Sequence, residues 1–188
     1  QLQTNTFEEN IADSYALKDL FYTIYTSPKA VIGQIEGHAI AGGCGLVSVC
    51  DIVFSIPEAK FGYTEVKIGF IPALVACFLV RRAGEARTKE LLLSGDLIDA
   101  QTASAYGLIN FIKSKEDIGQ SVKNYAEKIA AETSAQSVSL TKQLLNVAHN
   151  LTLEESLEEA VNLNATARAT ADCKRGISAF LNKEKISW

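Results

Sequence analysis

The fold is organised around residues 35–51, which read Ile-Glu-Gly-His-Ala-Ile-Ala-Gly-Gly-Cys-Gly-Leu-Val-Ser-Val-Cys-Asp. An apolar run, Ala30–Ile35, leads into this stretch and predicts a buried strand, and Leu46–Cys50 predicts a buried helix. Between them, Gly42 and Gly43 let the backbone lie against a ligand because they have no Cβ atom. The first N–H groups of a helix lack intrahelical acceptors and attract negative charge. The turn is therefore a candidate site for an oxyanion.

Taken alone, an Ala-Gly-Gly turn after a strand more often joins a strand to a helix than binds an anion. The residues that follow this turn make the anion-binding interpretation stronger. Ile52–Ile56 predicts a second short strand, and Ala59–Pro72 then reads Ala-Lys-Phe-Gly-Tyr-Thr-Glu-Val-Lys-Ile-Gly-Phe-Ile-Pro. Together the two segments resemble the enoyl-CoA hydratase/isomerase (crotonase) family. Three later segments match that family in the same order, namely Gly95-Asp-Leu-Ile-Asp-Ala, Ala105-Tyr-Gly-Leu-Ile and Gly176-Ile-Ser-Ala-Phe.

Composition limits the classes of protein to which the chain can belong. With 188 residues, 47% of them apolar, the chain can bury one substantial core. A formal net charge of -4 gives no general attraction to nucleic acid or to an anionic membrane. No apolar run approaches the length that spans a bilayer, and the polar residues 1–10 have no signal-peptide pattern. The four cysteines form no CxxC pair, and the two histidines are too few for a metal site. We therefore expect a cytoplasmic protein that binds no metal, nucleic acid or membrane.

The spacing of apolar residues predicts short strands followed by many helices. Besides the strands already named, Ala59–Gly62 and Leu108–Ile112 are expected to be extended. Asp99 and Thr152 are good N-cap residues for the helices that follow them. The predicted helices are Phe7–Thr26, Ala73–Arg82, Glu85–Leu93, Ala100–Tyr106, Asp117–Ala131, Ser137–Ala148, Thr152–Ala169 and Asp172–Leu181. The order is α/β first and all-α last.

The resemblance implies an α/β fold, a crotonase-like spiral of stacked β-β-α turns followed by a C-terminal helical trimerisation region. It places the spiral core in residues 1–134 and the helical oligomerisation region in residues 135–188. The family has further N-terminal turns before the position that matches Gln1. The implied assembly is a homotrimer or a hexamer made of two trimers.

The resemblance also implies the residues of the site. Gly42 matches the glycine whose backbone N–H forms half of an oxyanion hole for a thioester carbonyl, and Glu65 matches one of the family's two catalytic glutamates. Gly45 stands at the position of the other glutamate, and the second N–H donor is expected in an earlier turn. Contacts with the substrate are implied for Ala41, Gly43, Gly45, Pro72 and Leu74. The substrate is an acyl-CoA thioester, so coenzyme A is part of the substrate and no separate cofactor is expected.

These parts suit proton transfer next to a thioester. N–H donors on the thioester oxygen make the α-carbon acidic, and a carboxylate can then move a proton to or from carbon or water. The leading hypothesis is therefore an enoyl-CoA hydratase or dehydratase. An enoyl-CoA double-bond isomerase is the alternative, because one glutamate can move a proton between two carbons. A water held beside Glu65 and Gly45 would favour the hydratase, and a dry apolar surface there would favour the isomerase.

Two departures from the family pattern keep further possibilities open. Gly45 removes a carboxylate, and Ala73-Leu-Val-Ala-Cys replaces a glycine-rich stretch. The resulting pattern is similar to bacterial 3-methylglutaconyl-CoA hydratases and to polyketide dehydratases that act on branched, acidic acyl groups. The same departures leave room for a different class, a CoA-thioester binding or assembly subunit without turnover.

The C-terminal helices combine an apolar face with basic residues. The apolar residues are Val161, Leu163, Ala167, Ile177, Phe180 and Leu181. An apolar face with a charged rim is typical of a protein interface. The basic residues are Arg168, Lys174, Arg175, Lys183 and Lys185, and we expect some of them near the phosphates of coenzyme A.

Overall fold

The computed structural model describes residues 4–188, which fold as two compact units. The first unit contains Gly33–Ile118 together with the described residues up to Tyr25. The second unit contains Thr26–Ile32 and Gly119–Trp188. Among the described residues, no helix is long and apolar enough to cross a membrane.

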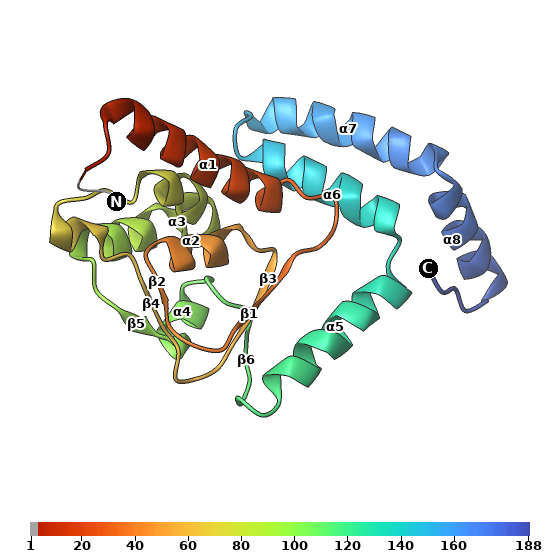
Figure 1. The fold of residues 1–188 in the computed structure, drawn as a ribbon. Coiled ribbons are helices and arrows are strands. Elements are labelled where there is room, and N and C mark those ends of the chain that lie inside the picture. Colours follow the sequence, from red (N-terminus) through yellow and green to blue (C-terminus); the bar gives the residue numbers. More distant parts are fainter. Residues whose placement is uncertain (1–3) are drawn as a thin grey trace. The chain divides into compact units, whose positions relative to one another are not determined.

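The first unit carries all of the short strands and the helices between them (Figure 1). Strand β1 starts at the boundary between the units, and its last three residues belong to the first unit. The elements are α1 (Phe7–Tyr25), β1 (Ile32–Ile35), β2 (Ala39–Ile40), α2 (Gly42–Val49), β3 (Ile52–Ser55), β4 (Lys60–Gly62), η1 (Glu65–Ile68), α3 (Ala73–Ser94), β5 (Ile98–Asp99), α4 (Ala100–Ala105) and β6 (Phe111–Ile112), where η1 is a 3₁₀-helix.

The first four strands alternate between two three-stranded sheets. One sheet has the order β1-β3-β6 and the other has the order β2-β4-β5. Strands β1 and β2 precede α2, and β3 and β4 precede α3, so each β-β-α turn adds one strand to each sheet. Strands β2 and β4 are parallel, with Ala39 opposite Phe61 and Ile40 opposite Gly62. This repeat confirms the predicted order of stacked β-β-α turns.

Apolar side chains hold the helices against these strands. Helix α2 packs against β2, α1 and α3. Phe21 from α1, Phe61 from β4 and Leu79 from α3 are fully buried. Burying a large apolar side chain stabilises a fold by about 1.5–3 kcal/mol. The predicted amphipathic first helix therefore contributes to the core of the first unit through Phe21.

The second unit is helical and contains α5 (Ile118–Glu132), α6 (Ala135–Ala148), α7 (Leu153–Ala169) and α8 (Ala171–Asn182). Helix α6 lies beside α7, as Figure 1 also shows. Thr152 caps α7 by accepting a hydrogen bond from the backbone N–H of Glu155, whose carboxylate accepts one from the N–H of Thr152 in return. The all-helical C-terminal part and the Thr152 cap are confirmed. That residues 135–188 drive oligomerisation stays a prediction.

Several element boundaries differ from the prediction. Helix α2 starts at Gly42 rather than at Leu46, because the glycines adopt helical geometry in the tight turn. The predicted strand Leu108–Ile112 is extended only at Phe111 and Ile112. Strands β2 and β5 and helix η1 were not predicted. They have two to four residues each, too few for a periodic pattern to show.

Candidate active site

Gly42 and Gly43 form the open first turn of helix α2. Both glycines are exposed, and a Cβ atom added at either would meet no heavy atom within 4 Å. Gly42 is the first helical residue, so its N–H has no acceptor within the helix. The structure thus places an accessible N–H donor and a helix N-terminus at the position predicted for an oxyanion.

Ala41 orients this first turn through a backbone conformation that is unusual for a residue with a side chain. Its φ is 53° and its ψ is -125°. Its N–H donates to the carbonyl of Gly62 on β4 at 2.9 Å, and its own carbonyl accepts from the N–H of Gly45 at 2.9 Å. Strained backbone of this kind persists only where surrounding contacts hold it, and it concentrates at functional sites. Both polar groups of Ala41 are thereby fixed, and the next N–H, that of Gly42, projects from the end of the helix.

Glu65 begins η1, three residues after Gly62, the last residue of strand β4. Its side chain is buried, and its Oε2 atom finds no hydrogen-bond partner among residues 4–188. A buried carboxylate oxygen without a partner is rare in native proteins and calls for an explanation. The backbone carbonyl of Glu65 accepts from the N–H of Phe70 at 3.0 Å, which closes the turn after η1.

The parallel pairing of β2 with β4 brings Glu65 and Gly42 to one edge of the sheet. Carboxyl ends of neighbouring parallel strands lie at the same edge, and α2 follows β2 as η1 follows β4. Tyr63, which lies between β4 and η1, donates its hydroxyl to the carbonyl of Cys44, so the start of η1 lies close to the first turn of α2. The two predicted catalytic residues therefore come from adjacent elements of the same unit.

Cys44 and Tyr63 are two buried titratable groups of this region. Burial raises the pKa of the Cys44 thiol to about 11, and burial raises the pKa of the Tyr63 phenol well above its usual value. The Tyr63 hydroxyl donates to the carbonyl of Cys44 at 3.2 Å. Both groups are therefore protonated at neutral pH, and neither can serve as a base. That Glu65 moves the proton stays a prediction.

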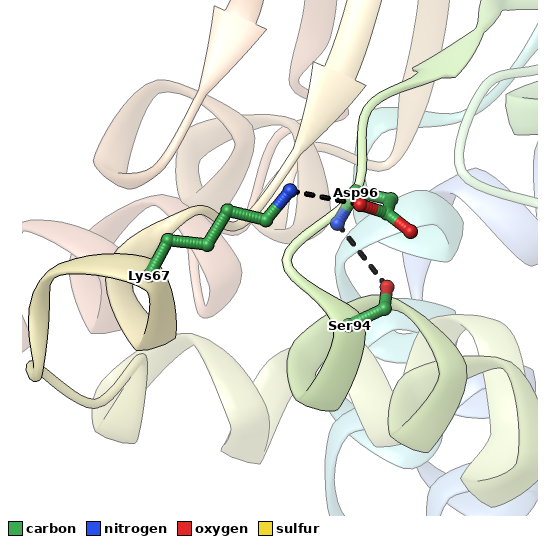
Figure 2. A network of polar contacts seen from close by, with 3 residues as sticks. All are labelled: Lys67, Ser94 and Asp96. Atoms are coloured by element: carbon green, nitrogen blue, oxygen red, sulfur yellow. Dashed lines mark hydrogen bonds and ion pairs between the residues drawn. The ribbon is translucent and has the colours of Figure 1, made fainter.

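A small polar network fixes η1 to the end of α3. Figure 2 shows Lys67, whose Nζ lies 2.8 Å from Oδ1 of Asp96, and Ser94, whose Oγ accepts from the N–H of Asp96 at 3.1 Å. The ion pair is exposed and contributes about 0–1 kcal/mol. Gly95 lies between Ser94 and Asp96, and its φ is 66°. A Cβ atom at Gly95 would lie 3.1 Å from Lys67 Cε and from Val66 Cγ2, so the glycine lets η1 pack closely.

Gly95→Ala should therefore destabilise the protein more than Gly69→Ala. Gly69 also has a positive φ, 75°, but a Cβ atom there would meet no heavy atom within 4 Å. We expect a loss of about 2 kcal/mol in the free energy of unfolding for Gly95→Ala and about 1 kcal/mol for Gly69→Ala, measured by urea unfolding. Equal losses would show that contact with Val66 and Lys67 does not matter.

The space beside Gly45 is filled by apolar side chains. A Cβ atom at Gly45 would lie 2.7 Å from Phe21 Cζ on α1 and 2.9 Å from Val75 Cγ2 on α3. Gly45 itself is buried. The position that matches the second glutamate of the family thus faces an apolar surface without an open gap. No sequence pattern indicated this contact, because Phe21 is one of several apolar residues in an amphipathic helix.

The remaining predicted substrate contacts lie where α3 starts. Pro72 is the N-cap residue of α3 and is buried, and Leu74 is half-buried in its first turn. Helix α3 packs against both α2 and η1. Contact of Ala41, Gly43, Gly45, Pro72 and Leu74 with a substrate stays a prediction. Residues 4–188 contain no cluster of histidine, cysteine and acidic side chains that could hold a metal ion.

Arg82 is a structural residue that was not predicted. Its Nε donates to the carbonyl of Leu108 at 2.9 Å, and its Nη1 donates to the carbonyl of Cys50, which follows α2. Burial lowers the pKa of Arg82. This side chain links the C-terminal end of α2 to the segment before β6. A single arginine in a helix gives no sequence signal for such a role.

Comparison with known proteins agrees with this geometry. The model of the family described as enoyl-CoA hydratase/isomerase matches residues 2–188. A Thermus thermophilus protein provisionally named enoyl-CoA hydratase is 44% identical, covering 94% of this chain and 69% of its own length. The crotonyl-CoA hydratase of Syntrophomonas wolfei is 32% identical, covering 90% of this chain and 65% of its own length. The chain thus spans about two thirds of the length of these two relatives.

A solved structure from Legionella pneumophila shares the fold. It is provisionally described as an enoyl-CoA hydratase/isomerase (crotonase), and it matches with a TM-score of 0.86 and 34% identity over 97% of this chain and 71% of its own length. The repeated β-β-α turns are thus those of the crotonase fold. Because the family model matches nearly the whole chain, the chain belongs to the enoyl-CoA hydratase/isomerase family.

Proposed function

We propose that the protein is an enoyl-CoA hydratase in which Glu65 moves the proton and the N–H of Gly42 holds the thioester oxygen. The observation that carries this proposal is the buried, unpartnered Oε2 of Glu65 beside the open first turn of α2. The names of the Thermus and Syntrophomonas relatives support hydration of an enoyl-CoA. A second N–H donor on the thioester oxygen would come from outside residues 4–188.

The proposed reaction needs one carboxylate. The oxygen of water bonds to the β-carbon, the π electrons move to the thioester oxygen, and Glu65 takes the proton that water loses. The enolate then collapses, and its electrons form a bond between the α-carbon and that same proton, returned by Glu65. H and OH have then added across the double bond, and Glu65 is regenerated. A preorganised N–H donor on an oxyanion is worth about 3–4 kcal/mol in such a step.

A double-bond isomerase is the second candidate, and the surface beside Gly45 favours it. Phe21 and Val75 make that surface apolar, where a second carboxylate or a polar group would help to hold the attacking water. In the isomerase, Glu65 takes a proton from the α-carbon of a 3-enoyl-CoA and returns it to the γ-carbon, which moves the double bond to position 2. No water is consumed, so the apolar wall is no obstacle.

The acyl group is proposed to be branched, of the 3-methylglutaconyl type. The support is the sequence pattern in which Gly45 and Ala73-Leu-Val-Ala-Cys replace the usual glutamate and glycine-rich stretch. Assays of the natural full-length protein with crotonyl-CoA, 3-methylglutaconyl-CoA and a 3-enoyl-CoA separate the possibilities. Formation of a 3-hydroxyacyl-CoA supports the hydratase, and formation of a 2-enoyl-CoA from the 3-enoyl-CoA supports the isomerase. Tight binding of all three without turnover would identify a CoA-thioester binding subunit.

We also propose that the protein forms a trimer or a hexamer through its C-terminal helices. On α7 and α8, Val161, Phe180 and Leu181 are 63%, 82% and 72% exposed. Apolar side chains this exposed are typical of an interface, and a closed ring repeats one interface around its axis. Of the basic residues, Arg175 lies over the Trp188 ring at 4.6 Å.

Light scattering of the natural protein is expected to give the mass of a trimer or a hexamer. Phe180→Asp, which puts a charge on the exposed face of α8, should dissociate it. Lys174→Gln on the same helix changes the net charge by the same single unit, so it serves as the control and should leave the mass unchanged. A monomer at micromolar concentration would rule out the proposed assembly.

A further inference from the structure

Two apolar side chains occupy the volume next to Gly45, and Phe21 contributes most of the contact. Both Cζ and Cε2 of its ring would lie within 3.1 Å of a Cβ atom at position 45. The ring is completely buried and is held edge-on against Phe78, with 6.0 Å between the ring centroids. The ring therefore has little freedom to move away. Any side chain at position 45 requires Phe21 to change.

Position 45 belongs to the same part of the site as Gly42 and Glu65. Gly42 and Gly45 are three residues apart on α2, so they lie on the same side of the helix, one turn apart. The N–H of Gly45 donates to the carbonyl of Ala41, the residue that orients the open first turn. The hydroxyl of Tyr63, two residues before Glu65, donates to the carbonyl of Cys44, directly before Gly45, at 3.2 Å. A side chain at position 45 would therefore start close to both predicted catalytic groups.

We propose that Phe21 is a specificity-determining residue whose ring takes the place of a second carboxylate, so that the site works with Glu65 alone against an apolar wall. This inference rests on the proposed function for the role of Glu65. It adds that the identity of residue 21 decides whether position 45 can hold an acid-base group. The two positions are coupled. A glutamate at position 45 needs a smaller residue at position 21, and a smaller residue at position 21 adds no carboxylate unless Gly45 is also replaced.

The steric part of this proposal is tested by unfolding. Gly45→Ala, the smallest change, should lower the melting temperature of the otherwise natural protein, because its Cβ atom meets Phe21 and Val75. In a Phe21→Leu background the same change should cost clearly less, because Leu has no atom at the place of Cζ. Phe54→Leu is the matched control, since it removes a buried ring of the same unit whose ring contact is with Phe111 and not with Phe21. Equal costs of Gly45→Ala in all three backgrounds would overturn the proposal.

The functional part is tested by rescue. Glu65→Gln should lose at least about 100-fold in kcat with the enoyl-CoA that the natural protein turns over, and adding Gly45→Glu with Phe21→Ala should restore at least about 10-fold of it. Removing the ring also gives the Val75 side chain room to rotate away. Gly45→Gln with Phe21→Ala in the same Glu65→Gln background is the control and should restore nothing.

The outcomes distinguish a failure of the proposed function from a failure of the proposal about Phe21. If the natural protein turns over no enoyl-CoA, or Glu65→Gln has no effect, the proposed function fails, and the unfolding cycle still decides whether Phe21 and Gly45 are coupled. If Glu65→Gln is inactive and the folded triple variant is no better than its glutamine control, a carboxylate at position 45 does not reach the substrate. In that case Phe21 does not determine the number of carboxylates, and the proposal is wrong.

Discussion

Glu65→Gln is expected to lower kcat by at least about 100-fold while leaving the affinity for the thioester nearly unchanged. Glutamine has the size of glutamate, but its amide cannot take a proton from water or carbon. The buried neighbours Cys44 and Tyr63 cannot replace it, because burial holds the pKa of the thiol at about 11 and raises that of the phenol well above its usual value. Steady-state kinetics and the binding of a non-reactive CoA thioester measure the two effects separately.

The fold of the Glu65→Gln variant should be intact. The Oε2 atom of Glu65 has no hydrogen-bond partner among residues 4–188, so no protein contact of that atom is lost. The backbone hydrogen bond from Phe70 to the carbonyl of Glu65 is unaffected by the side chain. A variant with an unchanged melting temperature and most of its turnover would show that Glu65 is a structural residue.

Gly42→Pro should remove about 3–4 kcal/mol of transition-state stabilisation, which corresponds to a loss of a few hundred-fold in kcat/KM. Proline has no N–H, so the proposed donor to the thioester oxygen disappears. Gly42 is the first residue of α2, a position at which helices accept proline well. The loss should therefore appear in catalysis rather than in folding, and circular dichroism can check the latter.

Gly42→Ala is the matched control, because alanine keeps the N–H and its Cβ atom would meet no protein atom within 4 Å. Its loss in kcat/KM should be clearly smaller than that of Gly42→Pro. If both variants fold and the proline variant retains normal kcat/KM, the N–H of Gly42 does not bind the oxyanion.

The overall order of elements could be predicted because most elements follow a pattern that runs over several neighbouring residues. Buried strands, amphipathic helices and capping residues such as Asp99 leave signals over several residues, and Asp99 indeed accepts from the N–H of Thr102. The break in α3 at Gly84, with φ 76° and ψ 167°, lies where the sequence predicts that one helix ends and another begins. The strands β2 and β5 have two residues each, and their pairing depends on neighbours distant in the chain.

The site could be predicted only in part, for a similar reason. Gly42 and Glu65 lie in motifs, and the structure brings them to one sheet edge through the pairing of β2 with β4. The positive φ of Ala41 depends on hydrogen bonds to both Gly62 and Gly45, which no local pattern reveals. The contact of Phe21 with Gly45 joins residues from two helices, so the apolar surface there was not predicted.

Glu65 is proposed to move a proton at the α-carbon of a bound acyl-CoA. Solvent deuterium tests this directly for the proposed hydration, because the proton that reaches the α-carbon in that reaction comes from water. In D₂O, the natural full-length protein should place deuterium at the α-carbon of its acyl-CoA product, as detected by NMR, and Glu65→Gln should place almost none there. No deuterium at that carbon with the natural protein, or equal labelling by both proteins, would rule out this role of Glu65.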